Sequence, residues 1–396
     1  MIIYSSNNID QFFTEMQRCT KCLLPITYPG IVFDKEGLCN YCNSHQKITL
    51  LGDDKFFDIL KRLKGRSEFD CIVPISGGRD SSYVLQQMVT KYKMNVLAVT
   101  VDHGFLLPEA YENISTITKN LNVKHEYIKY SEEKVNTLKN NVRIKFRGWV
   151  KNPSINTIIP VLNSGDKTMN LKMSQFAARQ GIRAILGGNV IGTSAFEQDF
   201  FKLGYMGVFP DIYWRFTFGQ KFKIFYKYLW EYLKNPYNYR FSIFSEYAKG
   251  YLIFFFEKLF RPKGIEYLGF WDYNYWEEEK ILKIIREIGW KGADDTTTTW
   301  RIDDAAYPLI NYLYLNIVGF TEHDEIYSKM IRENQITREE ALKRCLNDHK
   351  PRFKIIQKDL IDYGIHKDDL DLSINHFRFG FLNKLLKKKN IKFIKE

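Results

Sequence analysis

Residues 76–82, with the sequence SGGRDSS, are the segment whose residue types most directly suggest chemistry. Gly77 and Gly78 allow a sharp backbone turn and close approach to a ligand, so the amides around them can point at phosphate oxygens. Asp80 could cap a following helix or hold a magnesium ion. Three serines supply hydroxyl donors: Ser76, Ser81 and Ser82. The spacing differs from the GxxxxGK(S/T) motif of the common nucleotide-hydrolysing P-loop. The segment predicts a pyrophosphate-binding loop.

The flanking residues indicate which elements position this loop. Residues 71–75 form a short, unbroken apolar run, which is typical of a buried strand. After the loop, apolar residues recur at helical spacing: Val84, Leu85, Met88, Val89 and Tyr92. The loop is therefore predicted to join a strand to the N-terminus of a helix, a place where backbone amides bind anions.

Further strand and helix patterns alternate along the next hundred residues. Residues 95–101, 123–130 and 183–189 are strand-like, and residues 167–180 are helix-rich. This alternation predicts an α/β fold with a parallel sheet covered by helices on both faces. Ligands of such sheets bind beyond the carboxyl ends of the strands.

Several polar or glycine residues follow the predicted strands and are candidates for that edge. Asp102 could contact the adenosine ribose or magnesium, or simply cap a turn, and His103 could be a base, a phosphate contact or a structural residue. The candidate ligand-binding residues at this edge are Ser76, Gly77, Gly78, Arg79, Asp80, Ser81, Ser82, Asp102, Gly187, Gly188 and Asn189.

Four of the six cysteines form two CxxC pairs separated by sixteen residues: Cys19, Cys22, Cys39 and Cys42. This spacing is that of a zinc ribbon, in which four thiolates surround one tetrahedral ion without an open position for catalysis. An iron–sulfur cluster is an alternative, and disulfides are less consistent with a reducing cytosol. Cys71 is expected in the core, and Cys345 lies in an amphipathic, charged helical segment with no visible partner.

The length and charge of the chain limit the possibilities further. A chain of 396 residues suggests two or three domains, here residues 1–50 for the ribbon, 51–200 for the nucleotide-binding sheet, and 201–396 for an aromatic-rich helical part. A formal net charge of +12 favours anionic ligands, which include nucleotides, sugar nucleotides, RNA and anionic lipid surfaces.

The chain shows no secretory signal at its start, so a cytoplasmic location is expected. Long helices with many aromatic residues are predicted over residues 220–233 and 240–260. The most apolar stretch, residues 251–256, is far shorter than the roughly 20 residues of a membrane span. It is predicted to be a buried helix, and no transmembrane segment is expected.

Two segments of the C-terminal half combine aromatic rings with charges, YLGFWDY at residues 267–273 and TWRIDD at residues 299–304. Trp271 and Trp300 could stack on a sugar or a base, and Arg301 could pair with a carboxylate or phosphate. The alternative for Arg301 is a surface ion pair with Asp303 or Asp304. The predicted substrate-binding residues are Glu197, Trp271, Asp272, Trp300, Arg301 and Asp304.

SGGRDS at residues 76–81 resembles the SGGxDS signature of the PP-loop ATP pyrophosphatase families, which split ATP between the α and β phosphates. The order of parts, a four-cysteine ribbon, SGGRDS, YLGFWDY and WRIDDA, resembles the N-acetyl sugar amidotransferases of bacterial surface polysaccharide and nonulosonic acid pathways, such as lipopolysaccharide O-antigen synthesis. The similarity is nearly continuous over residues 18–42 and weakest over residues 200–261. Where this family is expected to carry a glycine-glutamate pair, this chain has Gly188 and Asn189, with Glu197 as a possible substitute.

The resemblance implies conversion of a sugar N-acetyl group to an acetamidino group through an O-adenylated intermediate. The candidate residues at the sheet edge listed above would bind ATP, with Ser76, Asp80 and Asp102 as the catalytic residues. ATP and Mg²⁺ would be required, zinc would be structural, and the substrate would be a sugar or sugar nucleotide, with no nucleic acid partner. Cys71 and Cys345 lie in no nucleophile-elbow setting, so a separate glutaminase is expected to supply ammonia. The rival interpretations are a PP-loop tRNA-thiolating enzyme, which would need further cysteines near the loop, and a non-catalytic nucleotide-binding scaffold.

Overall fold

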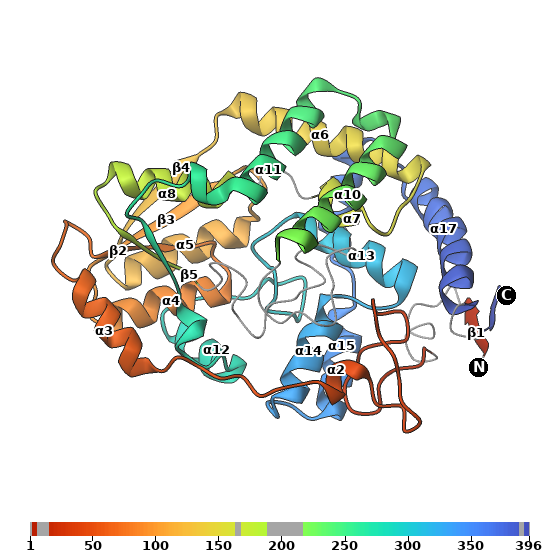
Figure 1. Ribbon diagram of the computed structural model, residues 1–396, viewed down its shortest axis with the longest axis horizontal. Coiled ribbons are helices and arrows are strands. Elements are labelled where there is room, and N and C mark those ends of the chain that lie inside the picture. Colours follow the sequence, from red (N-terminus) through yellow and green to blue (C-terminus); the bar gives the residue numbers. More distant parts are fainter. Residues whose placement is uncertain (1, 6–15, 163–167, 188–216, 388–391, 396) are drawn as a thin grey trace.

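The computed structural model describes residues 2–5, 16–162, 168–187, 217–387 and 392–395 (Figure 1). The centre of the fold is a five-stranded, wholly parallel sheet in the order β4-β3-β2-β5-β6. Its strands are β2 (Cys71–Pro74), β3 (Val96–Asp102), β4 (Lys124–Lys129), β5 (Ala184–Gly187) and β6 (Glu266–Gly269). The predicted α/β fold with a parallel sheet is confirmed. A second, two-stranded parallel sheet pairs β1 (Ile2–Ser5) with β7 (Lys392–Lys395).

Alternate side chains of the central strands enter two different cores, as the period of a strand requires. One face contributes Cys71, Val73, Ala98 and Leu186 to a core shared with α3 (Asp53–Leu63), α4 (Arg79–Thr90), α5 (Pro108–Asn120) and α12 (Glu278–Glu287). The opposite face contributes Ile72, Leu97, Val99 and Ile185 to a core shared with α8 (Met169–Arg179) and the start of α6 (Glu132–Lys151). The central strands are therefore apolar on both sides because helices cover both faces.

The sheet continues past residue 200, where the sequence suggested a domain boundary. β6 comes from the C-terminal half, pairs with β5 and leads through a 3₁₀ turn, Phe270–Asp272, to α12. Helix α12 packs against α4, the helix that follows the glycine loop. The C-terminal half thus completes both the sheet and the helix layer beside the loop.

The remaining helices form a second body around α13 (Ala306–Val318), whose side chains are buried on nearly all sides. It packs against α7 (Ile158–Leu162), α16 (Phe353–Tyr363) and α17 (Lys367–Lys387). Helices α14 (Glu322–Arg332) and α15 (Arg338–Asp348) pair with each other and carry the N-terminal cysteine segment, which includes the short helix α2 (Asn40–Asn43). Figure 1 shows this arrangement, with the red N-terminal segment lying across the blue C-terminal helices.

The two predicted aromatic helices are present as α10 (Phe218–Lys234) and α11 (Phe241–Phe260), joined by a 3₁₀ turn, Pro236–Asn238. Residues 251–256 form part of a helix, as expected, but the expectation that this helix is buried is wrong. Leu252 is 50% exposed and Phe256 is 45% exposed. The stretch lies in α11 at the edge of the helical body, so part of each turn faces outward. Among the described residues, no helix is both long and apolar enough to cross a membrane.

Candidate functional site

The glycine loop lies between β2 and α4, as predicted, at the carboxyl end of the central strand. Gly77 has a φ of +82°, and a Cβ there would lie 2.4 Å from the backbone oxygen of Ala110 on α5. Both the conformation and the space therefore require glycine. The Gly77 carbonyl accepts hydrogen bonds from Trp290 Nε1 at 3.0 Å and from Asn113 Nδ2 at 3.2 Å. These two buried side chains hold the loop in place.

Each of the three loop serines forms a hydrogen bond within the loop. The Ser76 amide donates to Ser81 Oγ at 3.2 Å, and the Gly78 amide donates to Ser76 Oγ at 3.4 Å. Ser82 is fully buried and donates its hydroxyl to the Gly78 carbonyl at 2.7 Å. Ser76 and Ser81 are partly exposed, so their hydroxyls are the ones that a ligand can reach, while Ser82 supports the turn.

Arg79 points its guanidinium into the protein instead of toward the mouth of the loop. It is 3% exposed, and its Nη1 donates to Glu278 Oε1 at 2.5 Å and to Thr299 Oγ1 at 2.7 Å. Its guanidinium carbon lies 3.4 Å from the centroid of the Trp300 ring. The side chain therefore joins the loop to the C-terminal half, and the backbone amide, at the first residue of α4, is the group of Arg79 that remains for the predicted ATP binding.

Glu278 bridges two arginines, since it also accepts from Arg344 Nη1 at 2.6 Å. We expect Glu278→Gln to lower the free energy of unfolding by about 3 kcal/mol, because two guanidinium groups would lose their buried counter-charge. Urea unfolding measures this effect. Glu340→Gln, which removes the exposed partner of Arg344, is the matched control and should cost less than about 1 kcal/mol. Equal effects of the two changes would contradict the structural role of Glu278.

Asp80 lies in the first turn of α4 with its side chain about one-third exposed. Its Oδ1 accepts from Trp276 Nε1 and from Arg79 Nε, each at 3.2 Å. The carboxylate is thus oriented from one side by buried donors and reachable from the other. This is a suitable arrangement for a metal ligand beside phosphate oxygens.

Asp102 ends β3 and caps the turn that follows it. Its Oδ1 accepts from the Gly104 amide and from the Tyr111 hydroxyl, both at 3.0 Å. Burial, together with this hydrogen bond, raises the pKa of Tyr111 to about 12, so the phenol is a stable donor at neutral pH. The turn-capping alternative for Asp102 is therefore present in the structure, and His103 next to it packs its ring near Phe105.

The loop after β5 is the other expected wall of the site. Gly187 ends β5 and is buried in the sheet. The predicted residues Gly188, Asn189 and Glu197 lie outside the described residues. In the order of the sheet, β2 is followed by β3 on one side and β5 by β6 on the other, so the carboxyl ends of β2 and β5 mark the topological switch point.

Asp303 lies over the glycine loop. From the sequence it was expected only as a possible ion-pair partner of Arg301. The Ser76 hydroxyl bonds its carboxylate, and a Cβ on Gly78 would lie 2.8 Å from Asp303 Oδ2. Residues 303–305 run beside residues 105–107, with Leu107 N donating to Asp303 O at 3.3 Å. Burial raises the pKa of the Asp303 carboxyl, the Ser76 hydroxyl and the charge of Arg301 oppose this effect, and the charge of Asp80 adds to it. Two carboxylates beside the glycine loop are oxygen ligands of the kind that a divalent cation takes.

The other predicted substrate residues are divided between the core and the site. Trp271 is buried and stacks on Tyr83 of α4 with ring centroids 5.5 Å apart, while Asp272 beside it is half-buried and its carbonyl accepts from the Leu51 amide. The structure therefore places Trp271 in the core of the sheet domain. Trp300 is half-buried, stacks on Trp276 and covers the Arg79 guanidinium.

Arg301 and Asp304 lie on the segment that carries Asp303. Arg301 has a φ of +50°, donates from Nε to Glu322 at 3.3 Å and stacks on the Tyr307 ring at 4.1 Å. Asp304 accepts from the Ala306 amide at 2.8 Å and so supports the first turn of α13. The sequence motif WRIDD thus brings Asp303 to the loop and uses its neighbours to anchor the segment.

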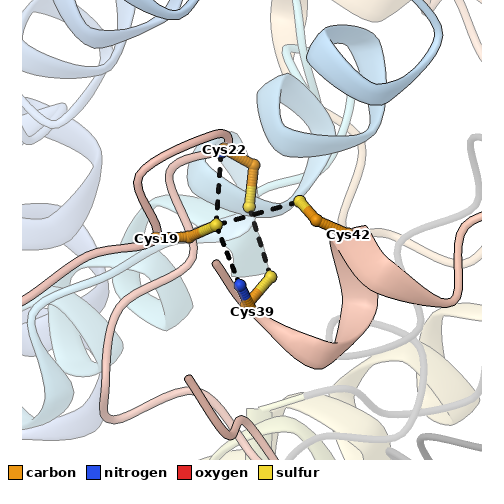
Figure 2. Close-up of side chains that lie close together, drawn as sticks. All are labelled: Cys19, Cys22, Cys39 and Cys42. Atoms are coloured by element: carbon orange, nitrogen blue, oxygen red, sulfur yellow. Dashed lines mark hydrogen bonds between the residues drawn. The ribbon is translucent and has the colours of Figure 1, made fainter. Parts of the chain in front are cut away.

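The four predicted metal-binding cysteines converge on one point, as Figure 2 shows. Sγ of Cys19 lies 3.8 Å from Sγ of Cys42, and Sγ of Cys22 lies 3.8 Å from Sγ of Cys39. Four sulfurs bound to zinc at about 2.3 Å form a tetrahedron with edges of about 3.8 Å. In a four-iron cluster each sulfur binds a different iron atom, which places the sulfurs farther apart. The donor set and its spacing therefore fit a single zinc ion.

Arginines of the C-terminal helices surround this cluster. Arg332 of α14 lies against the cysteine sulfurs, and Arg338 Nε donates to the carbonyl of Cys22 at 3.3 Å. Arg18, next to the first cysteine, forms a buried ion pair with Asp324 at 2.5 Å. Four thiolates on one zinc ion would leave two negative charges, which Arg332 beside the sulfurs would offset. The cysteine segment is therefore anchored on α14 and α15, about 300 residues away in the sequence.

Comparisons with known proteins give distant similarities. No protein-family model matches the chain. A curated relative, "Uncharacterized protein MJ1599" of Methanocaldococcus jannaschii, is 39% identical over 67 residues, which are 17% of this chain and 24% of that protein. The chain thus spans about a quarter of the length of this relative.

Similar solved structures include three chains with 13% to 16% identity. NMN synthetase from Francisella tularensis is 16% identical with a TM-score of 0.24, covering 47% of this chain and 70% of its own. U34-tRNA thiolase NcsA from Methanococcus maripaludis, solved with its 4Fe-4S cluster, is 13% identical with a TM-score of 0.31, covering 83% and 87%. NH3-dependent NAD synthetase from Campylobacter jejuni is 14% identical with a TM-score of 0.25, covering 50% and 93%. Because these TM-scores are low, we infer the chemistry of the site only from the residues of this chain.

Proposed function

We propose that this protein is an ATP-dependent amidotransferase that forms AMP and pyrophosphate while converting an N-acetyl group of a sugar, or nucleotide-linked sugar, to an acetamidino group. The observation that carries the proposal is the SGGRDS loop at the carboxyl end of the central strand, with Asp80 and Asp303 beside it. The resemblance of the whole order of motifs to sugar amidotransferases supports the choice of acceptor.

The loop supplies the groups that hold a departing pyrophosphate. Its free edge carries backbone amides at the N-terminus of α4, where the helix dipole favours negative charge. Ser76 and Ser81 add hydroxyls that can exchange their loop-internal bonds for phosphate oxygens. Because Trp290 and Asn113 fix the Gly77 carbonyl from behind, these donors are preorganised for the charge that develops as the Pα–O bond breaks.

Asp80 and Asp303 are the carboxylates that would hold the magnesium ion of MgATP. The ion would offset charge on the phosphate oxygens. Asp303 reaches the loop from the segment of the C-terminal half that also carries Trp300 and Arg301. The acceptor sugar would therefore bind between the sheet edge and this segment, where its amide oxygen can attack the α phosphate.

The chemistry balances in two steps. The amide oxygen bonds to the α phosphorus and pyrophosphate leaves, which gives an imidate-like adenylate. Ammonia then adds to the imidate carbon, loses a proton, and AMP departs with the former amide oxygen. An amide carbon resists direct attack by ammonia because its oxygen is a poor leaving group, and adenylation removes that obstacle.

Ammonia must come from elsewhere. All six cysteines are buried: four form the metal cluster, Cys71 lies in β2 and Cys345 lies in α15. A glutaminase nucleophile must be accessible to glutamine, so a separate glutaminase partner is proposed. The same burial argues against tRNA thiolation, which needs a reactive sulfur near the adenylation site. Co-purified RNA that receives sulfur would favour that rival, and a protein that binds ATP but never releases pyrophosphate would favour the non-catalytic scaffold.

The direct test is incubation with ATP, magnesium, ammonium and a panel of diacetamido sugars, free or linked to UDP or CMP. Mass spectrometry should show the small mass loss that accompanies replacement of an oxygen by an NH group, together with AMP. Products of ADP and orthophosphate would contradict the proposal. Glutamine should replace ammonium only when a glutaminase is added.

Asp80→Ala should abolish AMP formation, with a loss of at least about 100-fold, because it removes the carboxylate held beside the phosphates. The measurement is pyrophosphate release at saturating ATP. Asp58→Ala, an exposed change on α3, is the control and should have no effect. Undiminished AMP release by the Asp80 variant would remove the loop from the mechanism.

A further inference from the structure

The helical hairpin of α10 and α11 carries a large exposed apolar surface that the proposed reaction does not use. On α10, Trp230 is 55% exposed and Phe222 is also 55% exposed, and on α11, Phe241 is 86% exposed. We define the hairpin face by its exposed apolar residues: Phe218, Phe222, Tyr226, Leu229, Trp230 and Leu233 on α10, and Phe241, Phe244, Leu252, Phe256, Leu259 and Phe260 on α11. A surface of this kind marks an interaction site.

The hairpin face is the outer side of the two helices, because their other sides are used for packing. Tyr232 of α10 contacts Tyr247 of α11 edge-to-face at 5.2 Å, and Glu231 binds the Ser154 hydroxyl at 3.0 Å. On α11, Glu246 binds Asn141 and the buried Lys145 of α6. Figure 1 shows both helices, in green, beside α6. The body of the protein therefore lies on the side of the hairpin opposite to the exposed rings.

The charges next to the hairpin face are basic. At about 100° per residue, the six exposed apolar residues of α10 span an arc of roughly 120°. Lys223, Lys227 and Lys234 follow within roughly 60° of one edge of that arc, and all three are exposed. Glu231 accepts from the Ser154 hydroxyl through one carboxylate oxygen and pairs with Lys234 at 3.3 Å through the other, so Lys223 and Lys227 carry the basic charge of this edge. An aromatic and leucine stripe with lysines along its edge is the pattern of helices that lie in a membrane interface.

We propose that the hairpin face rests on an anionic phospholipid bilayer, with α10 and α11 lying in the plane of the interface. Trp230, Tyr226 and the phenylalanines would enter the boundary between headgroups and acyl chains, where amphipathic rings are favoured. The lysines would contact lipid phosphates, in keeping with the net charge of +12. Neither helix is apolar enough to span the bilayer, so the attachment is peripheral and reversible.

Flotation of the purified full chain with lipid vesicles tests this proposal. The chain should float with vesicles of phosphatidylcholine containing phosphatidylglycerol, and binding should fall with added salt and with phosphatidylcholine alone. Leu229→Glu combined with Trp230→Glu should weaken binding at least about tenfold. Lys223→Gln combined with Lys227→Gln should weaken binding to the anionic vesicles about fivefold per lysine and leave the weak binding to phosphatidylcholine unchanged.

Matched variants distinguish binding by the hairpin face from nonspecific hydrophobic binding to vesicles. Ile361→Glu on α16 and Leu372→Glu on α17 replace residues that are 74% and 73% exposed, and they should bind vesicles like the unaltered chain. Thermal unfolding should show that all variants remain folded. Absence of flotation with anionic vesicles would overturn the proposal. So would a self-association that the Leu229 and Trp230 changes abolish while vesicle binding persists, because the face would then belong to a second copy of the chain.

Discussion

Replacing Asp303 by asparagine is expected to slow pyrophosphate release from ATP by at least about 100-fold while leaving the fold intact. The carboxylate bonds Ser76 and lies against Gly78, so under the proposed function it would be among the groups closest to the phosphates of ATP. Asparagine keeps the shape and one acceptor oxygen but cannot supply the charge that holds magnesium. The effect should appear in kcat and in the dependence of the rate on magnesium concentration.

The stability of this variant should change in the opposite direction to its activity. Because burial raises the pKa of Asp303 above its unfolded value, the folded state binds the proton more tightly than the unfolded state. Stability therefore falls as pH rises from about 4 through the raised pKa, and the cost of the ionised form persists at neutral pH. Asp303→Asn removes this cost and should be at least as stable as the unaltered chain at pH 7. A variant that loses activity by unfolding would contradict the assignment.

Asp304 provides the matched control one residue away. Its carboxylate accepts from the Ala306 amide, a position that asparagine also fills well. Asp304→Asn should therefore release pyrophosphate within about threefold of the unaltered rate, since the group is not required for charge. If Asp304→Asn strongly slowed pyrophosphate release and Asp303→Asn did not, Asp304 and not Asp303 would be the carboxylate that acts at the loop.

The parts of this site that the sequence predicted are those that depend on local pattern. The run at residues 71–75 and the helical spacing after Ser82 place the loop between β2 and α4 without reference to any distant residue. The two CxxC pairs predict that four sulfurs meet at one metal site, because each pair places two sulfurs on one tight turn. The alternation of strands and helices likewise fixes a parallel sheet.

The parts that the sequence did not predict depend on contacts between distant segments. Arg79 follows the glycines and looks like a phosphate ligand, but Glu278 and Trp300, about 200 residues later, take up its side chain. The sequence predicts that Trp271 stacks on a sugar or a base, but Trp271 instead stacks on Tyr83 within the core. Asp303 and Asp304 are chemically identical in the sequence. Only the pairing of residues 303–305 with 105–107 decides which of them reaches the loop.

The cysteine cluster should be the largest single contributor to the stability of the N-terminal segment. Residues 16–44 contain little regular structure beyond α2, and all four cysteines are buried. As thiolates, sulfurs 3.8 Å apart would repel one another unless a cation lay between them. We therefore expect the segment to need a bound metal ion in order to fold onto α14 and α15.

Cys39→Ala is expected to remove the metal and to lower the free energy of unfolding by at least about 3 kcal/mol. Elemental analysis should give one zinc per chain before the change and none after it, and proteolysis should then begin in the N-terminal segment. Cys345→Ala is the matched control, since Cys345 is equally buried on α15. It should retain the zinc and cost only about 1 to 2 kcal/mol for the lost packing. Iron and sulfide in the purified chain would replace the zinc assignment with a cluster. An unchanged stability in Cys39→Ala would show that the segment folds without metal.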